Sequence, residues 1–114
     1  MERIAYFYQK INEVITEYIA ERQMSASVEG LKYQPILDTA NQHFQLVLLG
    51  WKNKERIYSL LFHIDIIDNK IWVQEDNLEY SVAERLVALG VDKKDIVLAY
   101  FSPHHRKHTE YAIA

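Results

Sequence analysis

Apolar side chains recur at intervals of three and four along residues 2–22. An α-helix turns once in about 3.6 residues, so this spacing places them on one face. We therefore predict an amphipathic helix from residue 2 to about residue 22, ended by Ser25-Ala26-Ser27. The apolar stripe consists of Ile4, Phe7, Ile11, Val14, Ile15, Tyr18 and Ile19.

Short apolar segments separated by turn residues follow the helix. Pro35 lies in the first segment and favours an edge strand, because proline cannot donate a hydrogen bond to a neighbouring strand. Asp68 and Asn69 both tolerate a positive φ, which predicts a two-residue hairpin turn. The predicted strands, arranged as an antiparallel meander, are Leu31–Asp38, Phe44–Trp51, Arg56–Ile67 and Lys70–Glu75.

A second helix is predicted from Ser81 to Gly90. Ser81 and Glu84 have the spacing of a capping box, and Gly90 is a typical C-terminal stop. A last strand is expected over Ile96–Phe101. This order predicts a single α+β domain over residues 1–114, in which the N-terminal helix packs on a mainly antiparallel four- to five-stranded sheet and the second helix precedes the last strand.

Composition narrows the function classes. The 114-residue chain is 49% hydrophobic, has a formal net charge of −3 and contains no cysteine. Disulfides and cysteine zinc sites are therefore excluded, and DNA binding by this chain alone is disfavoured, because such proteins usually carry a basic face. The sequence has neither the pattern of a signal peptide nor an apolar run of about 20 residues, so we expect a cytoplasmic protein with no membrane partner.

His63 and Asp65 are the first candidates for chemistry. Alternate residues of a strand share a face, so Leu61, His63 and Asp65 are expected on one side of the sheet. An imidazole beside a carboxylate suits a general base with its orienting partner, or two metal ligands. A hydrogen-bonded structural pair is the simpler interpretation, since no nucleophile or third ligand lies at a recognisable spacing. No catalytic residue, metal or cofactor is therefore predicted.

Further polar residues follow along the chain. Trp72 and Gln74 are expected to share one strand face, and Asp76 and Glu79 lie where acidic groups can bind the amides of a helix start. Histidines cluster in His104-His105-Arg106-Lys107-His108. His104 and His108 are spaced for one metal on a helix, and the cluster also suits phosphate. Eight tyrosines and two tryptophans favour association with another protein or a second copy.

A series of motifs extends over nearly the whole chain. It comprises Leu48-Leu49-Gly50-Trp51, Arg56-Ile57-Tyr58, His63-Ile64-Asp65-Ile66, Asn69-Lys70-Ile71-Trp72-Val73-Gln74-Glu75-Asp76, Ala83-Glu84-Arg85-Leu86, Gly90-Val91, Lys94-Asp95-Ile96-Val97-Leu98-Ala99, Arg106 with Thr109, and Ala112-Ile113-Ala114. In this order the motifs resemble the XisI family. The chain departs from the family's Asp-x-Thr-Glu pattern at Asp76-Asn77-Leu78-Glu79, so Ser81 is expected to cap the second helix instead.

The family is cyanobacterial and is known as the fdxN element excision controlling factor. The resemblance implies an accessory protein that acts with an XisH-like partner to control excision of a DNA element by a site-specific recombinase during heterocyst development. It implies regulation of DNA recombination through protein–protein interaction, not catalysis.

Two alternatives remain: a direct DNA-binding accessory factor, and an antidote-like inhibitor of a nuclease-like XisH partner. A homo-oligomer is also compatible with the sequence. For direct DNA binding, the phosphate contacts would be Lys93, Lys94, Arg106 and Lys107. The candidate functional surface consists of the retained motif positions Trp51, Arg56, His63, Asp65, Trp72, Gln74, Asp76, Glu79, Arg106 and Thr109.

Overall fold

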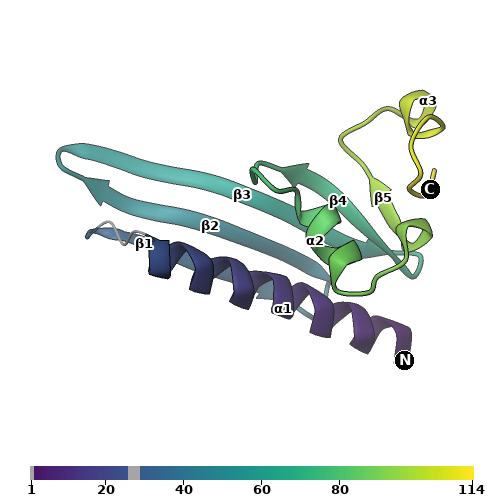
Figure 1. Cartoon of the computed structure of the whole chain (residues 1–114), viewed down its shortest axis with the longest axis horizontal. Coiled ribbons are helices and arrows are strands. Elements are labelled where there is room, and N and C mark those ends of the chain that lie inside the picture. The colour runs from purple at the N-terminus through teal and green to yellow at the C-terminus, as the bar shows by residue number, and fades with distance from the viewer. Residues whose placement is uncertain (1, 26–28) are drawn as a thin grey trace.

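The computed structural model describes residues 2–25 and 29–114. Over these ranges a five-stranded sheet carries two helices on one face, and a short helical segment lies near the C-terminus (Figure 1). In chain order the elements are α1 (Glu2–Ser25), β1 (Leu31–Asp38), β2 (His43–Lys52), β3 (Glu55–Ile67), β4 (Lys70–Asp76), α2 (Val82–Ala88), the 3-10 helix η1 (Lys93–Asp95), β5 (Ile96–Leu98) and α3 (Pro103–Arg106). Of the predicted break after the first helix, residues 26 and 27 lie outside the described residues.

The strands follow the order β1-β2-β3-β4-β5. The first four pair antiparallel, and β5 pairs parallel with β4. The α+β class, the antiparallel meander and the edge position of the Pro35 strand are thereby confirmed. The predicted two-residue hairpin turn is also confirmed, since Asp68 and Asn69 have φ values of 50° and 60°.

The core lies between the sheet and its two helices. Phe7, Ile11 and Val14 of α1 are each 1% exposed, as the predicted apolar stripe requires. Leu86 of α2 and Phe62 of β3 are fully buried in the same cluster. Both α1 and α2 therefore cover the same face of the sheet, which we call the helix face, and we call the opposite one the open face.

A β-bulge in β3 overturns one sequence expectation. Leu60 pairs with Val47 and Phe62 pairs with Leu46, so Leu61 is an extra residue in the strand. In such a bulge two successive side chains point to the same side. Leu61 is accordingly 9% exposed and belongs to the core, so the prediction that it shares a face with His63 and Asp65 is wrong.

The last strand is shorter than predicted. It ends at Leu98 instead of Phe101, because the chain turns at Ala99 and the Phe101 amide donates to the Leu98 carbonyl. Its partner strand β4 also contains a bulge, because the register of β4 against β3 shifts at Gln74. A bulge increases the local twist of a strand, which limits parallel pairing to the segment before it.

The open face carries no long helix among the described residues. The C-terminal segment runs beside the β5 edge of the sheet, where Ala112 forms a parallel bridge to Val97. The tip of the β2–β3 hairpin extends beyond α2 and beyond the end of α1 (Figure 1). Within residues 2–25 and 29–114, no helix is both long and apolar enough to cross a lipid bilayer.

Candidate functional site

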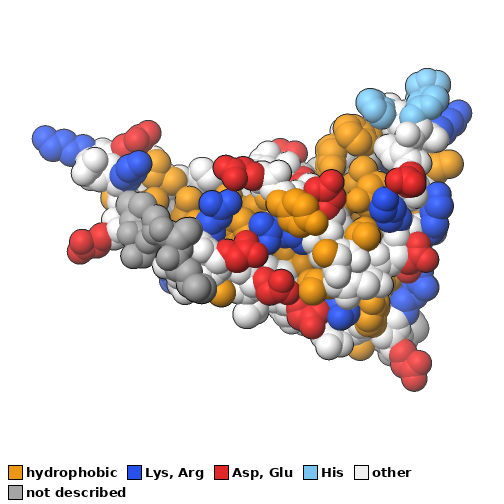
Figure 2. Space-filling view, viewed as in Figure 1, with side chains coloured by type: hydrophobic (Ala, Val, Ile, Leu, Met, Phe, Trp, Pro, Cys, Tyr) orange, Lys and Arg blue, Asp and Glu red, His pale blue; other side chains and the backbone are white. Residues whose placement is uncertain are grey.

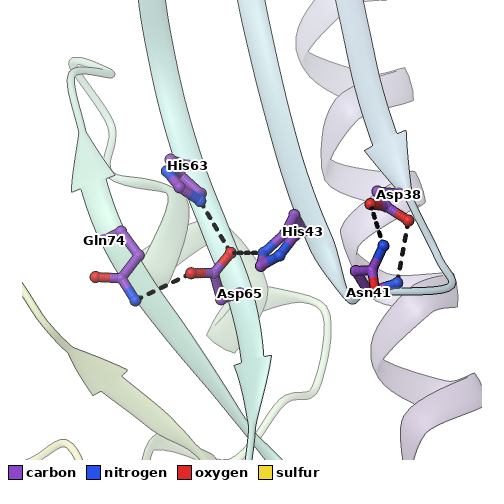
Figure 3. Close-up of polar contacts among 6 residues, drawn as sticks. All are labelled: Asp38, Asn41, His43, His63, Asp65 and Gln74. Atoms are coloured by element: carbon purple, nitrogen blue, oxygen red, sulfur yellow. Dashed lines mark hydrogen bonds and ion pairs between the residues drawn. The ribbon is translucent and has the colours of Figure 1, made fainter.

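Two histidines and an aspartate meet on the open face (Figure 3). His43 Nδ1 lies 2.7 Å from Asp65 Oδ1, and His63 Nε2 lies 2.9 Å from the same oxygen. Gln74 Nε2 donates to the other carboxylate oxygen, Oδ2, at 3.2 Å. We call these four residues the His–Asp cluster. It joins β2, β3 and β4 through side chains.

Asp65 is the centre of the cluster and is well enclosed, with its side chain 14% exposed. Burial by itself would raise the pKa of the carboxyl group. The hydrogen bonds with His43 and His63 outweigh that effect, so the pKa of Asp65 lies below its ordinary value. The folded chain therefore favours a charged carboxylate that faces two imidazole nitrogens.

His43 is the member of the cluster that sequence reasoning missed. It precedes the predicted second strand, and its spacing from Asp65 in the sequence matches no known motif. Strand pairing places His43 directly opposite Asp65, and Gln45 opposite His63. Only the register of the hairpin, including its bulge, could have identified His43.

Trp72 and Gln74 share the open face, as predicted. Trp72 pairs opposite Asp65, and the Arg106 guanidinium lies 5.4 Å from the centre of a Trp72 ring. Arg106 also donates to backbone carbonyls of the C-terminal segment, and Thr109 Oγ1 donates to the Arg106 carbonyl at 2.9 Å. The carbonyls that accept from Arg106 belong to Leu98, Ala99, Phe101 and Ile113. Arg106 thus ties the C-terminal segment to the sheet.

We expect Arg106→Ala to destabilise the chain by about 1.5–3 kcal/mol, the usual cost of losing hydrogen bonds made by a charged group. Trp72 would also become more exposed, which should shift its fluorescence to longer wavelength. Urea denaturation followed by fluorescence measures both effects. Lys107→Ala is the control, because Lys107 is a neighbouring exposed cation, and it should change stability by less than about 0.5 kcal/mol. Equal effects of the two substitutions would contradict this role of Arg106.

Trp51 and Arg56 lie far along the β2–β3 hairpin from the cluster. They are paired across the two strands, and the Arg56 guanidinium is 5.8 Å from the centre of a Trp51 ring. Tyr58 lies two residues further along β3 on the same face. Trp51 is 54% exposed and Tyr58 is 66% exposed, so the hairpin presents large aromatic surfaces.

Asp76 and Glu79 are separated from the other predicted residues. Asp76 accepts hydrogen bonds from the amides of Leu78 and Val82 at the start of α2, as expected, and burial raises its pKa. Glu79 instead lies 3.9 Å from the Arg22 guanidinium of α1. Ser81 caps α2 by accepting from the Glu84 amide. The ten candidate positions therefore do not form one continuous surface.

The predicted phosphate contacts have different surroundings. Lys93 forms an ion pair with Glu110 at 3.0 Å, while the side chains of Lys94 and Lys107 are exposed. His104 and His108 stand with ring centroids 5.6 Å apart, and His108 lies beyond the end of α3. Figure 2 shows acidic and basic side chains interspersed over the viewed face, with histidines gathered at the end that carries α3. This face has no continuous basic stripe.

Comparison with known proteins places the chain in a family. The family model described as XisI protein matches residues 1–113. A XisI-like protein from Anabaena variabilis ATCC 29413 has a solved structure with 34% sequence identity and a TM-score of 0.85, covering 97% of this chain and 99% of that one. The structure of the fdxN element excision controlling factor XisI from the same organism shares 26% identity at a TM-score of 0.76, with 98% and 99% covered. No curated protein matches the chain. The whole-length family match, together with the shared fold, establishes that this chain belongs to the XisI family.

Proposed function

We propose that this chain is a non-enzymatic control protein for excision of a DNA element, and that it acts by binding an XisH-like protein. In this proposal a separate site-specific recombinase performs the DNA chemistry during heterocyst development in cyanobacteria. The chain would act in the cytoplasm, where the DNA lies. The family membership and the similarity to a protein named as an excision controlling factor support this role.

The exposed end of the β2–β3 hairpin is the structural feature that best supports partner binding. Trp51, Arg56 and Tyr58 lie together on the open face, beyond the part of β3 that pairs with β4. Tryptophan, tyrosine and arginine are the residue types most enriched where binding energy concentrates in protein interfaces. The net charge of −3 favours a protein partner over bare DNA.

Co-expression with an XisH-like protein tests the proposal. We expect the two chains to co-purify and to give a defined mass by light scattering. Trp51→Ala should weaken the complex by roughly ten- to a hundredfold, which corresponds to about 1.4–2.8 kcal/mol. Isothermal titration with the purified proteins measures the change.

Ile113→Ala is the matched control, because Ile113 is another large apolar residue that is 51% exposed but lies in the C-terminal segment. It should leave affinity unchanged. Failure of the wild-type chains to form a complex would contradict the proposal. Binding of element-border DNA without the partner, weakening steeply with added salt, would instead favour direct DNA binding.

A further inference from the structure

A hollow on the open face is lined by His43, His63 and Asp65 of the His–Asp cluster. It lies over the adjoining ends of β1, β2 and β3, where these strands pair. Its floor and sides carry apolar, amide, imidazole and carboxylate groups. The lining residues are Ile36, Asp38, His43, Gln45, His63 and Asp65.

Three potential metal ligands converge in this hollow. One nitrogen of His43, one nitrogen of His63 and one oxygen of Asp65 all lie within 4.8 Å of one another. They come from two adjacent strands, so the sheet backbone holds their relative positions. A set of three ligand groups on paired strands differs from the two-residue motif visible in the sequence, which could not by itself hold an ion.

The surroundings of Asp65 match those of a metal-ligating carboxylate. Such carboxylates are commonly held by hydrogen bonds from residues outside the ligand set. Gln74 donates to Oδ2, while Oδ1 faces both imidazoles. The glutamine thus fixes the carboxylate in the orientation that directs its other oxygen toward the two imidazole rings (Figure 3).

We propose that His43, His63 and Asp65 bind a divalent transition-metal ion of the zinc class. Two imidazole nitrogens and one carboxylate oxygen suit zinc, whereas calcium and magnesium prefer sites made of oxygen ligands alone. Three protein ligands leave a fourth position for water or for a side chain of a binding partner. The site is independent of the proposed XisH-like partner and is tested on the isolated chain.

Binding requires the three ligand atoms, which lie within 4.8 Å of one another, to take the spacing of a tetrahedral site. In tetrahedral zinc sites with bonds of about 2.0–2.2 Å, neighbouring ligand atoms lie roughly 3.3 Å apart. The imidazole nitrogens are 2.7 and 2.9 Å from Asp65 Oδ1, so each ring must move away from the carboxylate by about half an ångström. The His43 side chain is 55% exposed and has room for this movement. An ion would replace the hydrogen bonds to Oδ1 and keep the one from Gln74.

The test uses the full chain after removal of metal with a chelator. Titration of the chain with zinc ions, monitored by calorimetry, should show binding of about one ion per chain with a micromolar or tighter dissociation constant. Cobalt ions should give the visible absorption of a tetrahedral complex. His43→Ala and Asp65→Asn should each weaken binding at least roughly tenfold and reduce the zinc-dependent rise in melting temperature.

His104→Ala and His108→Ala are the matched controls, since they remove histidines from the other cluster, and both should bind zinc like the wild type. His43→Gln provides a second, conservative variant should His43→Ala fail to fold in the metal-free state. The proposal would be overturned by the absence of saturable binding. It would equally be overturned by binding that survives His43→Ala and is lost in His104→Ala.

Discussion

Leu61→Ala and Phe62→Ala are both expected to destabilise the chain strongly, although the two residues are adjacent in a strand. Truncating a buried leucine costs about 2–5 kcal/mol and a buried phenylalanine about 3–5 kcal/mol, because each leaves a cavity. Folded domains are stable by only about 5–15 kcal/mol, so either loss is a large part of the total. Chemical denaturation with urea measures both variants against the wild type.

Tyr58→Ala is the control within the same strand, since Tyr58 is 66% exposed, and it should change stability by less than about 0.5 kcal/mol. The result for Leu61 is the decisive one. In a strictly alternating strand Leu61 would face away from the core and tolerate truncation. A small effect of Leu61→Ala would contradict the bulge, whereas a large one would support it.

Gly50→Ala is expected to cost about 2–4 kcal/mol, the second large effect. Gly50 has a φ of 140°, and an added Cβ would lie 1.9 Å from the Gly30 carbonyl oxygen. That oxygen accepts a hydrogen bond from the Trp51 amide at 3.0 Å. Relieving the overlap requires backbone movement and loss of this hydrogen bond, which together cost about 1–3 kcal/mol in strain and about 1 kcal/mol in bonding.

Gly90→Ala is the matched control for Gly50. Gly90 also has a positive φ, of 106°, but its added Cβ would meet the end of the Tyr6 side chain at 3.4 Å. Its cost should be the backbone term alone, about 1–2 kcal/mol. Thermal and urea unfolding of the two variants compare them directly. If Gly90→Ala proved as damaging as Gly50→Ala, the close approach of the Gly30 carbonyl to Gly50 would not be the cause.

Local signals predicted most of the elements. The spacing of Phe7, Ile11 and Val14 identified the face of α1 that packs on the sheet, because helical period and burial coincide there. Asp68 and Asn69 identified the turn between β3 and β4, and Pro35 identified an edge strand. Each of these inferences depends on residues within one turn or one strand.

The candidate site was only partly predictable. His63 and Asp65 were recognisable because alternation in one strand brings them to one face. If Leu61 were paired in a regular ladder instead of forming the bulge, the register continued from the hairpin turn would place His43 opposite Ile64 instead of Asp65. The bulge therefore decides which residue of β2 meets the carboxylate.

The sequence by itself determined the family, the α+β class and the order of the elements, because these depend on motif order and on local periodicity. Tertiary structure alone decided that Leu61 enters the core, that His43 and Gln74 meet Asp65, and that Asp76 and Glu79 lie apart from them. Strand register and bulges are set by packing across the whole sheet, where one added residue changes which side chains meet. The His–Asp cluster exists as a possible binding site for that reason.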